Sequence, residues 1–523
     1  MRTPQRQGTR GAVRSRTSSL PPPVAGLNAR DSVADMKPED AILLDNWFPL
    51  ATEVKVRDGY SSFATFTGDC ESVVVYNGVT ATKIFVCVNT TNDLIINATA
   101  GGAISTAVVG SSGPTVQAIT NSRWDYVNYP TAGGNFLSMV NGTDTALEYD
   151  GTTWSTASLT HADLASTDDL FTNAVYAERM WFAEKDTFNL YYLPVRTKSG
   201  ATTKLNVGSL FKLGGYLSNV ITVTDSTDTL TDYIGFVSSE GEVIAFTGTD
   251  PSSAATWAQA AHFQIGRPVC KGQRAWTKFG ADCLITTVDG VVSLRAAIAS
   301  DRAENASSVT GKIRRLISED VTVNGSRYGW ATVLHPSGQK LFVNVPTLES
   351  STSRQYVMNT ETRAWCRYTG WNAFSWGATK DAVYWGGAGV LALADHGSED
   401  GSSSITADAK QAYSYFGARG RTKQIQLMRP IIAISGNAEF GVSIDTDYEE
   451  GSSPVLSSIS GSASDPWGGV WSAAWSQALA VYRNWFSVAG EGFAIAPRVK
   501  ATVQDVQLVW SATDFVHDNG QGL

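Results

Sequence analysis

Charged residues are scarce in this chain of 523 residues, because Asp, Glu, Lys and Arg together make up only 17% of it. Glycine, in contrast, contributes 48 residues and tryptophan 16. Such a balance favours short strands and turns over long helices, which use many charged residues. We therefore expect an all-β protein, long enough for about two to four domains or for one large repeat domain with additions.

The sequence also has few residues that could bind metals or form disulfides. No C-x-x-C motif occurs, and the five histidines are scattered, with no two of them at metal-ligand spacing. The cysteines are odd in number and widely spaced, which indicates neither a disulfide framework nor a zinc site. We expect no metal, no cofactor, and buried free thiols at Cys70, Cys87, Cys270, Cys283 and Cys366.

No catalytic motif is assembled in the sequence. Asp445, Asp447 and Glu449 resemble the start of a calcium loop, but Leu456 occupies the twelfth position, where a bidentate Glu is needed. A glycosidase needs two carboxylates in one pocket, and the sequence cannot bring any two together. We expect a protein that is not an enzyme, although acids that could form a pair are numerous, among them Asp144, Glu148, Glu178 and Glu184.

Long apolar runs are missing as well, and no stretch approaches 18 uninterrupted apolar residues. We expect neither a secretion signal nor a membrane span. The net charge is −9, and the body without its first 16 residues holds 35 basic and 49 acidic residues, a net charge of −14. An acidic body repels nucleic acid. A basic arm opens the chain and either contacts phosphate or an acidic partner, or remains a solvated tail; its arginines are Arg2, Arg6, Arg10, Arg14 and Arg16.

Residues 70–396 repeat one pattern, an apolar β-run, a tight turn and a second β-run, as in "DYIGFVSSEGEVIAFTGT" and "DCLITTVDGVVSLRAAI". The turns contain Glu240-Gly241 and Asp289-Gly290, pairs that suit two-residue hairpins. Spacings of roughly 40 to 57 residues are typical of propeller blades. We predict an irregular β-propeller of six or seven blades, with an irregular stack of β-sandwiches as the alternative.

The rest of the chain divides into four parts. Residues 1–25 form a basic flexible arm, and residues 26–69 an N-terminal assembly segment. Within this segment, Pro38, Glu39 and Asp40 suit the first turn of a short helix that Pro49 ends. A polar linker at residues 397–407 precedes a second β-rich domain, a platform that residues 408–523 form together with the N-terminal segment.

Aromatic residues are densest near the C-terminus, where four tryptophans are interleaved with Gly and Ala. Such a cluster suits a subunit interface, a sugar-stacking platform or core packing of the second domain. The four are Trp467, Trp471, Trp475 and Trp485.

The two ends of the chain, "PPPVAGLNARDSVADMKPEDAILLDNWFPLATEVKVRDGY" and "VQLVWSATDFVHDNGQGL", resemble the ends of tail nozzle proteins of short-tailed bacteriophages, also called tail hub or packaged-DNA stabilisation proteins. The resemblance covers about 40 residues at the start and some 100 at the end, and the middle is similar in architecture only.

This resemblance implies a structural protein of the virion tail that assembles in the cytoplasm of the bacterial host. Six copies would form a tube below the portal and its adaptor protein, with genomic double-stranded DNA passing through the lumen and tail fibres as further candidate partners. The opening segment would then be an assembly element or, alternatively, an intramolecular clasp. Its expected contact residues are Leu27, Asn28, Arg30 and Asp31, with Trp47 and Phe48 as an apolar anchor.

Two other readings of the sequence stay open. The first is a carbohydrate-binding or glycan-degrading β-propeller involved in host attachment, with the tryptophan cluster as its platform. The second is a cytoplasmic scaffold propeller that binds peptides on one face.

Overall fold

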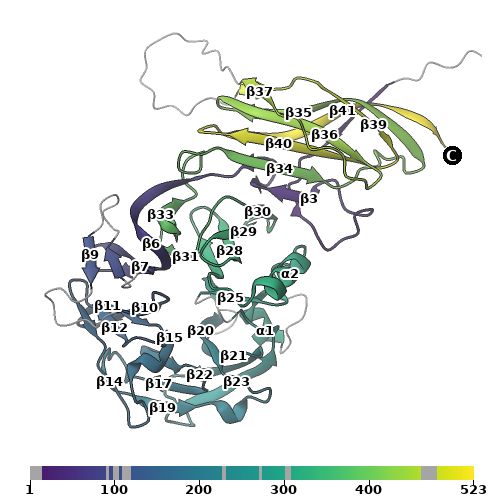
Figure 1. Cartoon of the computed structure of the whole chain (residues 1–523). Coiled ribbons are helices and arrows are strands. Elements are labelled where there is room, and N and C mark those ends of the chain that lie inside the picture. The colour runs from purple at the N-terminus through teal and green to yellow at the C-terminus, as the bar shows by residue number, and fades with distance from the viewer. Residues whose placement is uncertain are drawn as a thin grey trace, which may run out of the picture. The chain divides into compact units, whose positions relative to one another are not determined.

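The structure of the chain is a computed structural model, which describes residues 15–89, 94–97, 105–108, 119–225, 231–269, 274–300, 308–460 and 480–522. Strands dominate, at 57% against 5% helix, and the α-helices of the described residues are α1 (Leu294–Ser300) and α2 (Arg314–Asn324) (Figure 1). Two compact units are present: residues 58–402 form one, and residues 1–57 with 403–523 form the other. The prediction of an all-β fold is confirmed.

Residues 58–402 form a β-propeller-like arrangement with five blades. In most of its sheets, antiparallel strands pair in sequence order. Three sheets have four strands: β10 (Asp125–Thr131), β11 (Gly134–Val140), β12 (Leu147–Tyr149) and β13 (Trp154–Thr156); β15 (Leu170–Tyr176), β16 (Arg179–Glu184), β17 (Asn189–Tyr192) and β19 (Thr203–Asn206); β20 (Leu217–Asp225), β21 (Thr231–Ser238), β22 (Glu242–Gly248) and β23 (Trp257–Gln264). Then follow β24 (Trp276–Phe279), β25 (Asp282–Thr287) and β26 (Gly290–Ser293), and the successively paired β27 (Ala331–His335), β28 (Lys340–Leu348), β29 (Thr352–Asn359) and β30 (Trp365–Tyr368).

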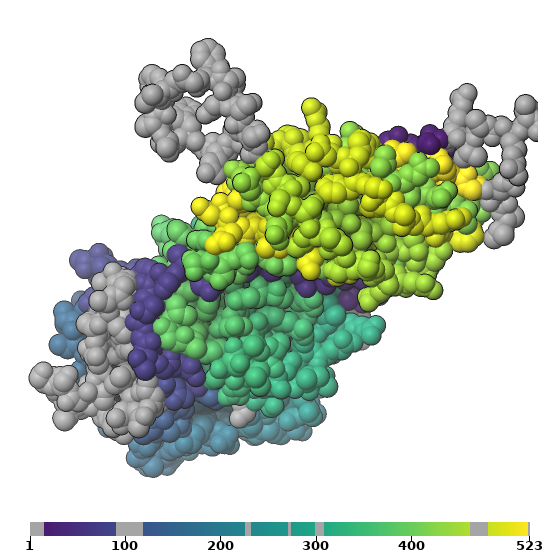
Figure 2. Space-filling view, turned by 45° about the horizontal axis from the view of Figure 1, so that its top comes forward, coloured from purple at the N-terminus to yellow at the C-terminus, as the bar shows by residue number. Residues whose placement is uncertain are grey.

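The ring of the propeller is closed by strands from its two ends. The long strand β6 (Tyr60–Asn77) pairs on one side with β33 (Ala388–Ala394) and on the other with β7 (Thr82–Asn89). Figure 2 shows the seam as purple residues beside green ones. With β31 (Ser375–Ala378), β32 (Val383–Gly386), β8 (Leu94–Asn97) and β9 (Ser105–Val108), these strands make one 7-stranded sheet.

Five blades are fewer than the expected six or seven, and this sheet accounts for part of the difference. The sequence pattern counts every hairpin as a separate blade. Strand β6, however, joins the hairpins on both of its sides, and the sheet β24–β26 has only three strands. The propeller also begins at residue 58 and not at residue 70, because β6 starts at Tyr60.

The predicted hairpin turns are present. Gly241, between β21 and β22, has φ +85°, and Gly290, at the turn from β25 to β26, has φ +103°. Only glycine adopts such angles without strain, so the turn residues fix these two hairpins. Between neighbouring sheets, Trp154 of β13 packs on Phe85 of β7 at 5.1 Å between ring centroids.

The other unit combines both ends of the chain in two sheets. One sheet is built around β35 (Arg421–Ile434) and β41 (Leu508–Gly522), together with β1 (Arg16–Leu20), β4 (Trp47–Pro49), β5 (Val54–Val56), β38 (Ala480–Tyr482) and β39 (Phe486–Gly492). The other joins β2 (Gly26–Leu27), β3 (Asp40–Asp45), β34 (Ile405–Gln411), β40 (Ile495–Val503), β36 (Asn437–Thr446) and β37 (Ser457–Ser460). The rings of Phe440 and Phe486 connect the two sheets at 5.8 Å. The platform of the predicted fold is therefore present.

The predicted short helix before Pro49 is absent, and β3 and β4 occupy its place. A helix of two turns is marginal alone, whereas β3 gains the partner strand β34, with Ala41 opposite Gln411 and Asp45 opposite Asp408. Asn46 then adopts φ +58° and separates β3 from β4. Tertiary pairing therefore overrides the local helix signal.

Two other expected segments also differ from the structure. Residues 16–20 of the predicted flexible arm form strand β1, because Leu20 is buried and the whole strand pairs with β41. The predicted linker 397–407 ends earlier, since β34 begins at Ile405, which is 1% exposed.

Candidate functional site

The propeller surrounds a central cavity of about 450 Å³. Strands β10, β15, β20, β24, β27 and β31 each contribute a part of its wall. These are the first strands of successive sheets, so residues that are far apart in the sequence meet around one space. In β-propellers this is the place where side chains from all blades can contact one ligand.

Arg274 is fixed on the cavity wall by β10. Its guanidinium lies 3.6 Å from the ring centroid of Tyr126, donates a hydrogen bond to the Tyr126 carbonyl, and lies 3.4 Å from the carboxylate of Asp125. Burial raises the pKa of Asp125, and Arg274 opposes this shift, as does the Thr172 hydroxyl, which donates a 2.6 Å hydrogen bond. The cation is thus held in one orientation by a ring and a buried acid.

Several polar atoms on the wall have no hydrogen-bond partner among the described residues. Asn173 donates from Nδ2 to the Ser138 carbonyl at 3.1 Å, but its Oδ1 is buried and unpaired. The indole nitrogens of Trp276 and Trp376 are also buried and unpaired. All three atoms are closed to water, so they lie behind the surface of the cavity and are not available to a group inside it.

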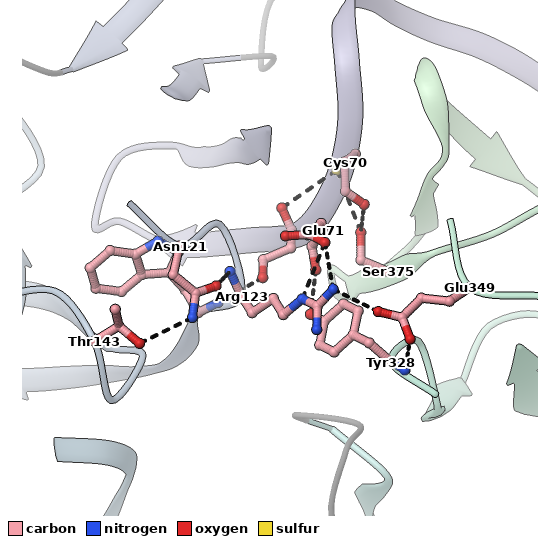
Figure 3. Close-up of polar contacts among 10 residues, drawn as sticks. Cys70, Glu71, Asn121, Arg123, Thr143, Tyr328, Glu349 and Ser375 are labelled. Atoms are coloured by element: carbon pink, nitrogen blue, oxygen red, sulfur yellow. Dashed lines mark hydrogen bonds and ion pairs between the residues drawn. The ribbon is translucent and has the colours of Figure 1, made fainter. Parts of the chain in front are cut away.

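A second polar cluster lies beside a smaller cavity of about 30 Å³, which Glu71 and Tyr328 line (Figure 3). Arg123 donates to Glu71 at 2.9 and 3.1 Å and to Glu349 at 2.8 Å, and its guanidinium lies 4.2 Å from the Tyr328 ring centroid. The Tyr328 hydroxyl donates to the Glu71 carbonyl, and Ser375 donates to the Cys70 carbonyl at 2.8 Å.

This cluster connects segments that are remote in the sequence. Glu71 lies on β6, Arg123 precedes β10, and Glu349 follows β28. Both carboxylates share one guanidinium, and burial raises the pKa of Tyr328, which therefore stays a neutral hydrogen-bond donor. The arrangement fastens the start of the ring to its last sheets, and its groups are already saturated by one another.

The acids considered for a carboxylate pair lie apart, and none of them lines the 450 Å³ cavity. Each is bound by its own neighbours: Asp144 by Thr120 and Asn141, Glu148 by Lys198, Glu178 by Arg196, and Glu184 by Asn189.

The residues expected at an assembly contact are mostly buried in their own unit. Leu27 is 3% exposed, Asn28 2% and Phe48 2%, and Trp47 is fully buried with its ring centroid 5.8 Å from that of Trp510. Asn28 donates to Asp31 and Asp40 at 2.9 and 3.0 Å, and the partners Arg30 and Asp31 form an exposed ion pair. Asn28, Trp47 and Phe48 are therefore packed inside the unit that both ends of the chain form, as the alternative of an intramolecular clasp expects.

The structure describes one residue of the predicted tryptophan cluster and one arginine of the predicted basic arm. Trp485 is 39% exposed, with the Arg429 guanidinium 4.5 Å from its ring centroid. Arg16 lies on β1 opposite His517. Outside the described residues are Trp467, Trp471, Trp475, Arg2, Arg6, Arg10 and Arg14.

The acids that resemble a calcium loop are also bound within the chain. Asp445 pairs with Lys410 at 2.5 Å, and Asp447 accepts hydrogen bonds from the amides of Phe493 and Ala494. No group of three metal-binding side chains occurs within the described ranges. The free thiol of Cys70 is buried, and burial raises its pKa to about 12.

The cavity residues Arg274, Asn173 and Trp376 were not singled out from the sequence. They carry no motif, because each comes from a different sheet and is separated from the next by about one repeat or more. The signal that could have found them is their position: Asn173 and Trp376 lie on the first strand of their sheets, and Arg274 lies two residues before such a strand.

Comparisons with known proteins show likeness at the level of structure only. No family model matches the chain, and no curated protein matches it. The N-terminal part of BBS1, solved in complex with ARL6, has 9% identity and a TM-score of 0.37, over 65% of this chain and 97% of that one. YCF48 from Cyanidioschyzon merolae has 11% identity and a TM-score of 0.35, over 66% and 97%. A family 43 arabinoxylan arabinofuranohydrolase from Bacillus subtilis has 10% identity and a TM-score of 0.26, over 86% and 96%. Likenesses this weak carry no information about what this chain binds or does.

Neither helix in the described part of the chain has the length and apolar character needed to cross a membrane.

Proposed function

We propose that the protein is a structural component of a bacteriophage tail, a nozzle subunit that forms a tube below the portal and its adaptor. The proposal begins from the resemblance of the two ends of the chain to tail nozzle proteins. The observation that supports it is the way in which these same two ends fold together. Strand β1 pairs with β41, β3 with β34, and β5 with β41. Both ends of the chain therefore form one β-unit, and the propeller lies between these ends in the sequence.

Two further features agree with a role in assembly and DNA passage. The clasp of Asn28, Trp47 and Phe48 holds the N-terminal segment in the platform, which gives a rigid unit of the kind that a ring of subunits needs. The acidic balance of the body would let a DNA backbone slide along a wall without binding to it, since basic side chains add affinity for every phosphate that they neutralise.

Quantitative mass spectrometry of purified, DNA-filled phage particles tests this proposal. The chain is counted against a capsid protein of known copy number in the same particles. We expect about six copies per particle, as the family resemblance implies. Absence of the chain from particles would overturn the proposal.

A further inference from the structure

The two central strands of one platform sheet are apolar on the side that faces away from the core. Burial alternates along β35 and β41: Ile432 and Trp510 are buried, and the residues of the opposite side are partly exposed. The solvated face of an antiparallel sheet normally carries polar residues. Here the partly exposed side carries a set of apolar residues, namely Leu427, Ile431, Ala433, Val509, Ala512 and Val516.

The strand register joins these residues into one surface. Leu427 lies opposite Val516, and Ala433 lies between Val509 of β41 and Val481 of β38. Val481 is 61% exposed. We call this surface, Val481 included, the apolar face. From Leu427 to Ala433 it extends over about 20 Å along β35.

The other sheet of the same unit provides an internal comparison. On its outward side Thr406 lies opposite Thr502 and Asp408 opposite Lys500. Arg498 donates to the Asp408 carboxylate at 2.8 and 3.0 Å. This side is polar, as a solvated sheet requires. The apolar face of the first sheet is therefore specific to it and indicates a contact that removes the face from water.

An ion pair lies between the rows of the apolar face. Arg429 lies opposite Asp514 and donates to its carboxylate at 2.6 and 3.1 Å. The guanidinium lies 4.5 Å from the ring centroid of Trp485. A positive and a negative group side by side form a pattern that complements itself after half a turn, so that Arg429 of one copy meets Asp514 of another. A second copy of this chain is thus a partner whose charges fit.

We propose that two copies of this chain pair through their apolar faces, sheet against sheet, about a two-fold axis at the Arg429–Asp514 pair. Sheets pack in this way in β-sandwiches, where the side chains of the two faces interdigitate. The proposal goes beyond the tail function and does not rest on it, because a ring of subunits uses head-to-tail contacts, whereas this contact joins the same surface of both copies.

Sedimentation equilibrium of the full chain over a concentration series tests the proposal. We expect a reversible dimer with a dissociation constant on the order of 10–100 µM, because a face of this length is at the small end of specific interfaces. A chain that stays monomeric at every concentration would overturn the proposal. Flotation of such a monomer with phosphatidylcholine vesicles would assign the apolar face to lipid instead.

Exchange of the two charges locates the contact. Arg429→Asp and Asp514→Arg each bring like charges together across the two-fold axis, and each should weaken dimerisation more than about tenfold. An equimolar mixture of the two variants has opposite charges at both contacts and should dimerise as the unmodified chain does. The control is Arg498→Asp, which breaks the comparable ion pair on the polar sheet and should leave dimerisation unchanged.

A second pair of variants tests the apolar part of the contact. Val481→Glu places a charge in the apolar face and should also weaken dimerisation more than about tenfold. Its control is Val455→Glu, because Val455 is 87% exposed and lies beside Gly441 of the other sheet. Thermal unfolding first establishes that each variant is folded. The proposal is wrong if either charge variant dimerises as tightly as Arg498→Asp, if their mixture stays monomeric, or if Val481→Glu matches Val455→Glu.

Discussion

His517 occupies a buried position where the first and last strands of the chain meet. Its Nε2 lies 2.9 Å from the Ser18 hydroxyl, and its ring centroid is 5.0 Å from that of Phe416. Burial lowers the pKa of His517 below its ordinary value of 6.5. The unfolded chain therefore binds a proton at this position more readily than the folded one does, and stability decreases as the pH falls below about 6.5.

The His517→Gln variant should reduce this loss of stability. We expect the platform unit of the unmodified chain to unfold at lower temperature at about pH 5 than at about pH 7, and the variant to show a smaller difference, because its neutral amide cannot be protonated. Calorimetric melting curves at both pH values measure the effect. His161→Gln, in the propeller, is the control and should keep the original pH dependence. An unchanged pH dependence in His517→Gln would show that other groups cause the acid sensitivity.

At this same scale, the sequence singled out some residues that matter to packing but none that line the cavity. Trp47 and Phe48 were expected as an apolar anchor of an assembly contact, and the structure buries both of them within their own unit. Arg274, Asn173 and Trp376 are ordinary in the sequence, and only the closure of the ring brings them to one cavity. The roles of such residues depend on tertiary contacts that no local pattern encodes.

Strands β32 and β6 approach each other closely at one glycine. A Cβ on Gly386 would lie 2.2 Å from Cys70 Sγ and 2.6 Å from Cys70 Cβ. Real carbon atoms do not come this near to such neighbours, so β32 can pack on β6 only with glycine at this position. Gly386 thus contributes to the seam of the ring through its small size.

Gly386→Ala should therefore destabilise the propeller by about 1–3 kcal/mol, the usual cost of an extra methyl group in a packed interior. Denaturant unfolding followed by tryptophan fluorescence measures this cost. Gly311→Ala is the matched control, because a Cβ at Gly311 meets nothing within 4 Å. Equal stability of the two variants would mean that the seam can relax around the added methyl.

Among elements, those with strong local signals were predicted well. The hairpins β21–β22 and β25–β26 follow from their Glu-Gly and Asp-Gly turns, which are local signals that place the flanking strands side by side. The prediction of a short helix before Pro49 was wrong because this segment forms β3, which pairs with β34 more than three hundred residues later in the sequence. The blade number was overestimated in part because one long strand, β6, pairs on both sides and merges two hairpins into one sheet.

On the scale of the whole molecule, the propeller closes upon itself. Gly59 donates its amide to the Gly397 carbonyl and accepts from His396, while Tyr60 donates to the Glu399 carbonyl. Buried Lys340 pairs with Asp395 and Asp58, which adjoin His396 and Gly59 in the sequence; burial alone would lower its pKa, but the two carboxylates hold it above the ordinary value. Both ends of residues 58–402 are thus fixed within that unit.

A chain of residues 58–402 alone should consequently fold. We expect circular dichroism typical of β-sheet and one cooperative thermal transition, since the closing strand pairs and the buried ion cluster all remain. The control is residues 78–402, which lacks β6 and with it the seam. If the longer fragment behaves like the shorter one and shows no cooperative transition, the propeller depends on the other unit.

The placement of the platform strands at both ends of the chain has a consequence during synthesis. Strands β1 to β5 leave the ribosome first, but their partners β34 and β41 come after the whole propeller. At translation rates of about 5–20 residues per second, the early strands wait on the order of tens of seconds without their partners. During this interval the propeller can close, whereas the apolar residues around Trp47 stay open to other chains. Nascent subunits made close together on one messenger are therefore exposed to exchange of these strands before each platform is complete.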